Sequence, residues 1–285
     1  MNGTVEGLLA RLILEPSFLE QVREDRQSAL AGYAPDAGIA EAVAGENLEK
    51  IRRFAGFIGK VQHNHLWEWF PATRMLLIHY EIELDLFTRY RAVQATAEWQ
   101  RASRGDRVGK LLDFIADCAV GKYPGLGDVV RHERAIWQAT SDIHSGRGPV
   151  AAQEHDEFRH MPWSVVQRMR PTLEEGVRVL SFCFDPNRLT ATILAGEFAG
   201  KLPSGPPITL AYLPGRTGEV RILRADEMTV FILGHVNGLR SVRSVIARVR
   251  TDGFAGLRPK AFQEFFEGAA EAGFIRMNAA GEKAA

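Results

Sequence analysis

The last quarter of the chain changes from strand-like to helical spacing, and this change constrains the fold more than any other feature. In residues 219–224, Val220 and Ile222 fall on one face of an extended segment, which predicts a half-covered strand. The apolar run 208–213 precedes it, and the stretch between them contains the proline and glycines of a reversing loop. The sequence therefore predicts a β-hairpin.

Two helical patterns follow this hairpin. Asp226 stands at the position of a helix N-cap, and the Asn237-Gly238 pair is a helix stop signal. Ser241 is the N-cap of the second pattern. The apolar residues of that pattern recur three and four apart, which predicts one buried face: Val242, Val245, Ile246 and Val249.

A third helical pattern begins near Pro259 and ends at Gly273. Phe274 and Ile275 then predict a short return strand. The apolar side of this last helix is rich in phenylalanine and alanine: Phe262, Phe265, Phe266, Ala269 and Ala270. The order of elements is thus strand, strand, three helices and a final strand.

Residues 220–277 resemble the precursor-peptide recognition element of ribosomal peptide biosynthesis, a PqqD-like winged helix. The strings that carry the likeness are "VRILRADEMTVFILGHVNGLRSVRSVIARV" and "FQEFFEGAAEAGFI". The resemblance implies a groove between the outer strand and the third helix, in which a leader peptide adds as an extra strand. The residues it implies for peptide binding are Arg221, Leu223, Phe262, Phe265, Phe266 and Ala269. The alternative is that the phenylalanines only fill a small hydrophobic core.

Composition narrows the class of protein. Lys plus Arg and Asp plus Glu both number 35 in the 285 residues, so the formal net charge is zero and does not point to nucleic acid or an anionic membrane. Cys118 and Cys183 lie far apart without metal-ligand spacing, which argues against a disulfide scaffold or structural zinc. With no secretion signal or membrane-span pattern, we expect a cytoplasmic protein in a reducing compartment.

The first half of the chain is dominated by helical spacing. Two short helices are expected in the first forty residues, broken at Pro16 and stopped at Gly32. Further helices are predicted over residues 39–62, from 64 to about 103, and then over 108–120 and 127–139.

This helical half resembles the partner-protein family that accompanies the multinuclear non-haem iron-dependent oxidases. The strings are "VQHNHLWEWFPATRMLL", "ELDLFTRYRA", "LLDFIADCA" and "YPGLGDVVRHERAIWQA". The residues that stand at the family's positions are Asn64, Phe70, Pro71, Phe87, Phe114, Asp128, Glu133 and Trp137. The chain departs from the family by having Arg131-His132-Glu133 with Arg134, where members often have Arg followed by Leu-Glu-Trp.

Together the resemblances imply an α+β protein with a helical partner-like domain (1–145), a linker (146–165) and a winged-helix-like peptide-recognition domain with a small antiparallel sheet (166–285). They imply a non-catalytic subunit of natural product (RiPP) biosynthesis, of the methanobactin and thiaglutamate type. It would bind a ribosomal precursor peptide and present its cysteine to a separate TIM-barrel oxidase in a heterodimer. Iron is expected in that oxidase, and no cofactor or metal in this chain. Asn64, Trp67, Phe70 and Trp137 are the candidate partner interface, against the alternative that the aromatics are core.

An enzyme in its own right is disfavoured because the candidate groups lack catalytic or metal spacing. His63 and His65 are two residues apart and do not share a helix face. His155 and His160 are five apart in the expected linker, so a solvated connector is favoured over a metal site there. Glu133 is expected to form a buried ion pair. There is no nucleophile elbow, P-loop or dinucleotide-binding motif.

A winged-helix transcriptional regulator that binds DNA is the alternative function. Residues 217–260 contain eight Lys or Arg against four Asp or Glu, an excess suited to phosphate contacts. The phenylalanine-rich last helix argues against this alternative, because recognition helices expose polar side chains to the bases.

Overall fold

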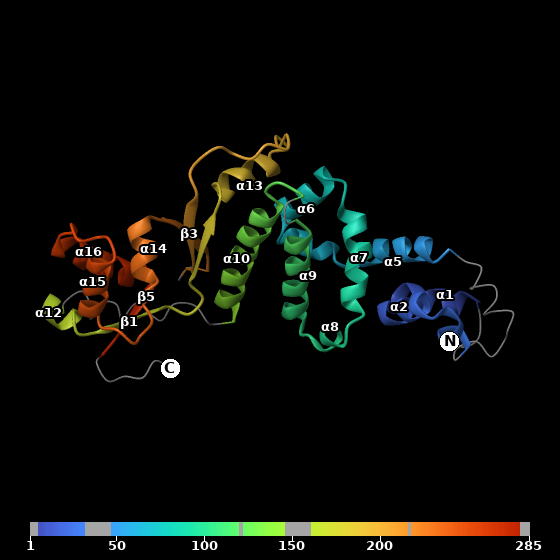
Figure 1. Cartoon of the computed structure of the whole chain (residues 1–285), viewed down its shortest axis with the longest axis horizontal. Helices are drawn as coiled ribbons and strands as arrows, with labels where there is room; N and C mark the ends of the chain where they lie inside the picture. Colours follow the sequence, from blue (N-terminus) through green and yellow to red (C-terminus); the bar gives the residue numbers. More distant parts are fainter. Residues whose placement is uncertain (1–4, 32–46, 120–121, 146–160, 216–217, 280–285) are drawn as a thin grey trace. The chain divides into compact units, whose positions relative to one another are not determined.

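The computed structural model describes residues 5–31, 47–119, 122–145, 161–215 and 218–279 (Figure 1). Within them helices are combined with two small antiparallel sheets, so the expected α+β class is confirmed. In this part of the chain no helix is both long enough and apolar enough to cross a membrane.

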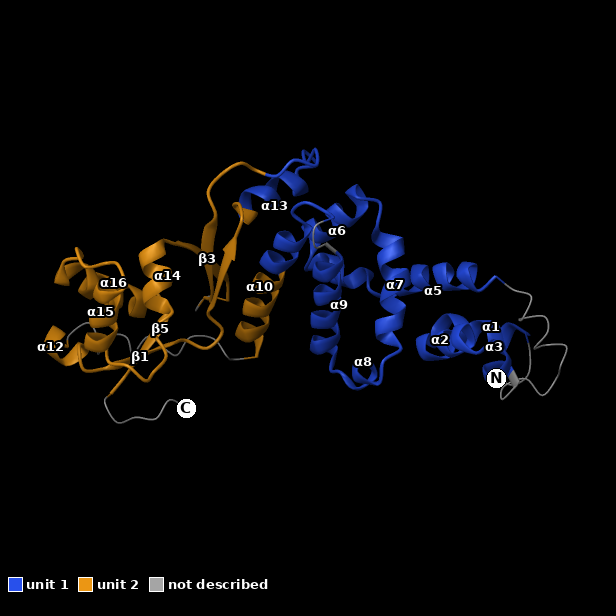
Figure 2. Cartoon of the chain, in the orientation of Figure 1, with its two compact units in different colours: residues 1–133, 187–202 blue, residues 134–186, 203–285 orange. Residues whose placement is uncertain are grey.

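The chain divides into two compact units (Figure 2). Unit 1 comprises residues 1–133 and 187–202, and unit 2 comprises residues 134–186 and 203–285. The expected linker at 146–165 stays a prediction, because residues 146–160 lie outside the described residues. The described end of that stretch contains helix α12 (Trp163–Val166), whose Val166 is buried in the core of unit 2.

Three short helices open unit 1: α1 (Val5–Leu14), α2 (Pro16–Glu24) and α3 (Arg26–Ala31). Pro16 occupies the first turn of α2, where its missing N–H leaves no hydrogen bond unmade, so the predicted break there is confirmed. The predicted stop at Gly32 lies outside the described residues. The buried side chains of these helices pack with Ile51 and Ala55 of α5 (Leu48–Gln62).

Helical structure continues through the rest of unit 1, as the spacing predicts. After α5 come η1 (Asn64–Glu68), α6 (Pro71–His79), α7 (Glu83–Gln94), α8 (Ala97–Arg101), α9 (Arg104–Ala119) and the first part of α10 (Leu126–His144). Most of α13 (Pro186–Leu194) also belongs to this unit.

A buried carboxylate from α10 caps the N-terminus of α6. The N-cap residue of α6, Phe70, offers no side-chain acceptor. Glu133 supplies one instead: Oε1 accepts from the N–H of Ala72 and Oε2 from the N–H of Thr73, both at 2.9 Å. The sequence predicts an ion pair for Glu133. The described contacts of Glu133 are instead two backbone hydrogen bonds at the positive end of α6.

We expect Glu133→Ala to lower the free energy of unfolding by about 2–4 kcal/mol, because the substitution leaves two buried N–H groups without an acceptor. Denaturant unfolding followed by circular dichroism measures the change. The matched control is Glu68→Ala, which removes an exposed carboxylate of η1. Equal midpoints for the two variants would contradict the capping role.

The same carboxyl group predicts a pH dependence of stability. Burial raises the pKa of Glu133, and the hydrogen bonds from Thr73 and Ala72 offset only part of that rise. The folded protein then keeps this proton to higher pH than the unfolded chain does, so the free energy of unfolding falls as pH rises between the ordinary and the raised pKa. In Glu133→Gln, which has no carboxyl group to titrate at this position, this part of the fall in stability with pH should be absent. Unfolding curves across the acidic range, compared with the wild type, test it.

Unit 2 is built on a three-stranded antiparallel sheet with the order β2-β3-β4. The strands are β2 (Arg178–Phe182), β3 (Ile208–Pro214) and β4 (Val220–Ala225). The predicted hairpin is confirmed as β3 and β4, in which Ala211 lies opposite Leu223 and Leu213 opposite Arg221. The central strand β3 is buried along nearly its whole length, as its continuous apolar run requires.

The two faces of β3 pack against different partners. Tyr212 and Leu210 form one cluster with Ala135 of α10. Ala211 and Leu213, on the other face, belong to the larger core made with the last three helices. An ion pair also joins the sheet to α10, since Arg178 of β2 lies 2.7 Å from a carboxylate oxygen of Asp142. The sheet thus separates α10 from the helices that follow β4.

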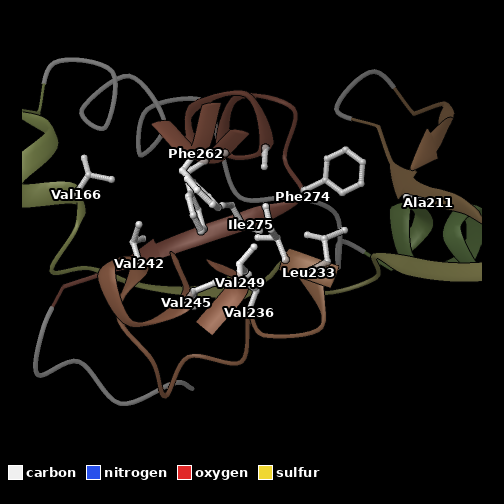
Figure 3. Packing of buried hydrophobic residues seen from close by; sticks show 14 of the residues in the cluster. Val166, Ala211, Leu233, Val236, Val242, Val245, Val249, Phe262, Phe274 and Ile275 are labelled. Carbon is white, nitrogen blue, oxygen red and sulfur yellow. The ribbon is translucent and has the colours of Figure 1, made fainter. Parts of the chain in front are cut away.

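Those helices are α14 (Glu227–Leu233), α15 (Val242–Thr251) and α16 (Pro259–Glu271). The predicted caps are confirmed, because the side chain of Asp226 accepts from the Thr229 N–H and that of Ser241 from the Ser244 N–H. Figure 3 shows their buried side chains around the final strand, β5 (Ile275–Asn278). The buried members include Val242, Val245, Val249, Phe262, Phe266 and Ile275.

A second sheet closes the unit, because β5 pairs antiparallel with β1 (Arg170–Leu173). The predicted return strand is thus confirmed one residue later than expected. Asn237 forms an isolated bridge with Thr172, and the N–H of Gly238 donates to the carbonyl of Pro171 at 2.8 Å. The Asn-Gly turn is therefore packed on β1, four residues after α14 ends at Leu233.

Candidate functional site: a groove beside an unpaired strand edge

A groove of about 320 Å³ lies between β4 and α16. Its lining comes from the hairpin, from α14, and from α16 with the residues that follow it: Ala211, Leu223, Arg224, Ala225, Thr229, Leu233, Glu264, Phe265, Gly268, Ala269, Ala272 and Phe274. Most of these side chains are apolar. The groove therefore has the composition of a site for an apolar side chain or an extended peptide.

The strand beside this groove has one free edge in the described part of the chain. β4 is the last strand of its sheet and pairs only with β3. The outer edge of such a strand presents backbone N–H and C=O groups to whatever lies beside it. A groove and an available row of hydrogen-bonding groups thus occur together.

Alternation along β4 decides which of its side chains face the groove. Leu223 lies opposite Ala211, and both line the groove. Arg221, two residues earlier, points to the same face of the sheet. Its guanidinium donates to the carbonyl of Ala272 at the C-terminal end of α16, at 3.3 Å. Arg221 therefore links β4 to α16 with its side chain at one end of the groove.

Helix α16 contributes one face to the groove and another to the core. Phe265 is half-buried and lines the groove, together with Ala269. Phe262 and Phe266 are only 1% and 0% exposed and belong to the core. The ring of Phe265 packs edge-on against Phe266, with centroids 5.3 Å apart. Of the three phenylalanines expected at the groove, the structure brings only Phe265 to it.

Sequence reasoning missed several lining residues. Gly268 and Ala272 follow Phe265 at intervals of three and seven, so the helical spacing contained the signal for both. Arg224 and Thr229 come from β4 and α14, and no local pattern connects them with α16.

A second hollow of about 500 Å³ continues past the end of β4. It is lined by the beginning of β3, the end of β4 and the first turns of α14, and it shares Arg224 and Ala225 with the groove. Asp226 and Glu227 give this end carboxylates, whereas Arg221 gives the opposite end of β4 a positive charge. Arg224 adds a positive charge to the same end, so this end of β4 has charges of both signs.

The expected partner-interface residues do not form one exposed surface. Trp67 and Phe70 are 5% and 1% exposed, and the Trp67 ring packs edge-on against Phe87. Trp137 is half-buried, and Asn64 is exposed. Trp67 and Phe70 are thus core side chains. The aromatic residue that reaches solvent in this segment is Trp69, which is 48% exposed.

The described residues contain no group of three or more His, Cys, Asp or Glu arranged to hold a metal ion. His63 and His65 each bond the backbone through Nδ1, to Gly59 and Gln62. Burial lowers the pKa of His63. His155 and His160 lie outside the described residues.

Neither cysteine forms a disulfide in the described structure. Cys118 is half-buried, and burial raises the pKa of its thiol. Cys183 is exposed beyond the end of β2.

Comparison with known proteins identifies no relative of this chain. A scan against protein-family models gave no match, and a search of curated protein sequences gave no match either.

Proposed function

We propose that this chain is a non-catalytic partner subunit that binds the leader of a ribosomal precursor peptide and presents the peptide's cysteine to a TIM-barrel multinuclear iron oxidase. The observation that carries the proposal is the unpaired edge of β4 beside the apolar groove of about 320 Å³. The order of hairpin, three helices and return strand agrees with a winged-helix recognition element, which the sequence resemblance implies.

The peptide would add to β4 as a further strand. Main-chain hydrogen bonds to the free edge supply affinity that depends little on sequence, and the groove selects side chains. Leu223, Phe265 and Ala269 offer an apolar surface, and Gly268 leaves room above α16. An apolar leader residue placed there would contribute about 1.5–3 kcal/mol through burial.

Tethering explains why such a subunit needs no catalytic residues. Once the leader is held on this chain and the chain is bound to the oxidase, the cysteine meets the iron site at a high effective concentration. In this proposal iron belongs to the oxidase, and the present chain binds no cofactor.

DNA binding is the alternative, and three contacts weigh against it. Of the arginines on α15, Arg248 is paired with Asp252 at 2.6 Å, and Arg250 donates to the carbonyl of Leu257 and lies over the Phe262 ring. Arg243 is exposed. The local basic excess is therefore partly used within the fold, which leaves fewer charges for phosphates.

The proposal requires two genes beside that of this chain, one for a small cysteine-containing precursor peptide and one for a TIM-barrel oxidase, and their absence would contradict it. The test uses the full chain and a fluorescent peptide that covers the leader of that precursor. We expect saturable binding by fluorescence anisotropy, co-elution with the neighbouring oxidase on size exclusion, and no binding of a scrambled leader. Separate elution of chain and oxidase with leader present would contradict the proposal. Salt-dependent retardation of duplex DNA, without leader binding, would favour the regulator instead.

A further inference from the structure

Helix α5 exposes an apolar face that none of the described residues cover. Phe54, Phe57 and Val61 recur three and four residues apart, so they share one side of the helix. They are 51%, 46% and 54% exposed. The two phenylalanine rings stack on each other with centroids 6.4 Å apart. Isolated exposed apolar residues are ordinary, but three in one row on a helix are typical of a binding surface.

The opposite side of α5 explains why these residues are left outside. Gly56 and Gly59 are buried, and Gly56 lies so close to Thr88 of α7 that an added Cβ would stand 2.8 Å from the Thr88 Cα. The close approach at Gly56 thus places α5 directly against α7, so Phe54 and Phe57 lie on the opposite side of the helix.

Two basic residues belong to the same exposed face. Lys50 precedes Phe54 by four residues, and Arg53 precedes Phe57 by four residues. Each basic side chain is therefore a neighbour of one phenylalanine on the helix surface. Both are exposed, and neither has a carboxylate partner among the described residues. The other basic residues of α5 have carboxylate partners: Arg52 pairs with Glu49, and Lys60 pairs with Glu83. Within the part of the chain that the structure describes, the face is therefore apolar with a positive border at Lys50 and Arg53.

We propose that this face, Lys50, Arg53, Phe54, Phe57 and Val61, docks on a second protein that offers an apolar patch bordered by carboxylates. This inference rests on the proposed function, under which that protein is the oxidase. Aromatic and arginine side chains are enriched at protein interfaces, and carboxylates opposite Lys50 and Arg53 supply the missing countercharge. The surface is distinct from the peptide groove, which lies in unit 2.

Other occupants fit the face less well. Two copies of this chain joined through α5 would bring together four positive charges and no carboxylate of the face. A single-stranded nucleic acid would satisfy the charges and stack on the two rings, but Val61 offers no aromatic surface to a base. A carboxylate-bordered protein surface satisfies both the apolar row and the charges.

The experiment measures binding of the purified neighbouring oxidase to the full chain by isothermal titration, with leader affinity measured in parallel. We expect the double variant Phe54→Ser/Phe57→Ser to weaken oxidase binding by at least about 30-fold. Lys50→Glu/Arg53→Glu should weaken it about 10-fold, and more at low salt. The controls are Ile78→Ser, which removes a 53% exposed apolar residue of α6, and Arg104→Glu, which reverses an exposed charge of α9. Both should bind as the wild type does.

Each outcome decides the point. Loss of oxidase binding with leader affinity and circular dichroism unchanged supports the docking surface. Wild-type oxidase affinity in the double variant overturns it and leaves the proposed function standing. Leader binding without oxidase binding by the wild type overturns this inference and the partner role together. If the double variant instead abolishes self-association by light scattering, or binding to anionic vesicles or single-stranded RNA, a different occupant is identified and the inference is wrong.

Discussion

Gly268→Phe is expected to weaken leader binding by at least about 30-fold, which corresponds to about 2 kcal/mol. Gly268 lies on the exposed side of α16 and lines the groove beside β4. A Cβ added there meets no atom within 4 Å, so the new side chain enters open space and leaves the core undisturbed. A phenylalanine ring in that space excludes the leader side chain that the groove would otherwise accept.

The same substitution should not destabilise the fold. Gly268 is an interior helical residue without a positive φ. Replacing it by phenylalanine gains a few tenths of a kcal/mol in helix propensity, less than replacement by alanine would. Loss of affinity with unchanged or raised unfolding temperature therefore points to a blocked groove rather than to a damaged protein.

The matched control is Gly256→Phe. Gly256 lies between α15 and α16, does not line the groove, and also has no atom within 4 Å of an added Cβ. We expect wild-type leader affinity for this variant in the same anisotropy titration. If Gly268→Phe also binds the leader normally, the peptide does not occupy the groove, and the role assigned to β4 and α16 is wrong.

Gly56→Ala is expected to destabilise the protein by about 2–3 kcal/mol, although alanine is the better helix former. The added methyl group would lie 2.8 Å from the Cα and 2.9 Å from the N of Thr88, and closer still to its hydroxyl oxygen. These backbone atoms cannot rotate away, so α5 must move from α7, and overpacking of this kind costs about 1–3 kcal/mol or more. That cost exceeds the gain of about 1 kcal/mol in helix propensity.

Gly59→Ala, in the same helix, is expected to raise the free energy of unfolding instead of lowering it. Its added Cβ would contact only the Cδ of Arg91, at an ordinary 3.8 Å, so the helix-propensity gain of about 0.5–1 kcal/mol remains. Denaturant unfolding of the two variants beside the wild type measures both effects. A stabilised Gly56→Ala protein would show that α5 and α7 are not held at this distance. It would also remove the reason given for the exposure of Phe54 and Phe57.

Local sequence signals predicted β3, β4, the three helices after β4 and β5 well, because these signals depend on neighbours in the chain. The period of two in β4 and the caps at Asp226 and Ser241 act within a few residues. The break at Pro16 follows from its missing N–H and fixed φ in the same way. Such features need no tertiary structure to be read correctly.

The exposure of aromatic side chains could not be predicted in this way. Phe262, Phe265 and Phe266 lie on one short helix, yet only Phe265 reaches the groove, because the other two are covered by α15 and β5. In unit 1, Trp67 and Phe70 are buried while Trp69 and Phe57 are exposed. Which side of a helix is covered depends on partners distant in sequence.

The sequence by itself determined the β3–β4 hairpin, the helices that follow it and the helical character of the described residues within 47–139, since propensity, capping and periodicity are local properties. Only the tertiary structure decided that Glu133 caps α6 across about sixty residues of chain, that β4 remains the edge of its sheet, and that a groove lies beside it. Those features depend on the packing of segments far apart in the chain, and local patterns in a single sequence do not predict such packing.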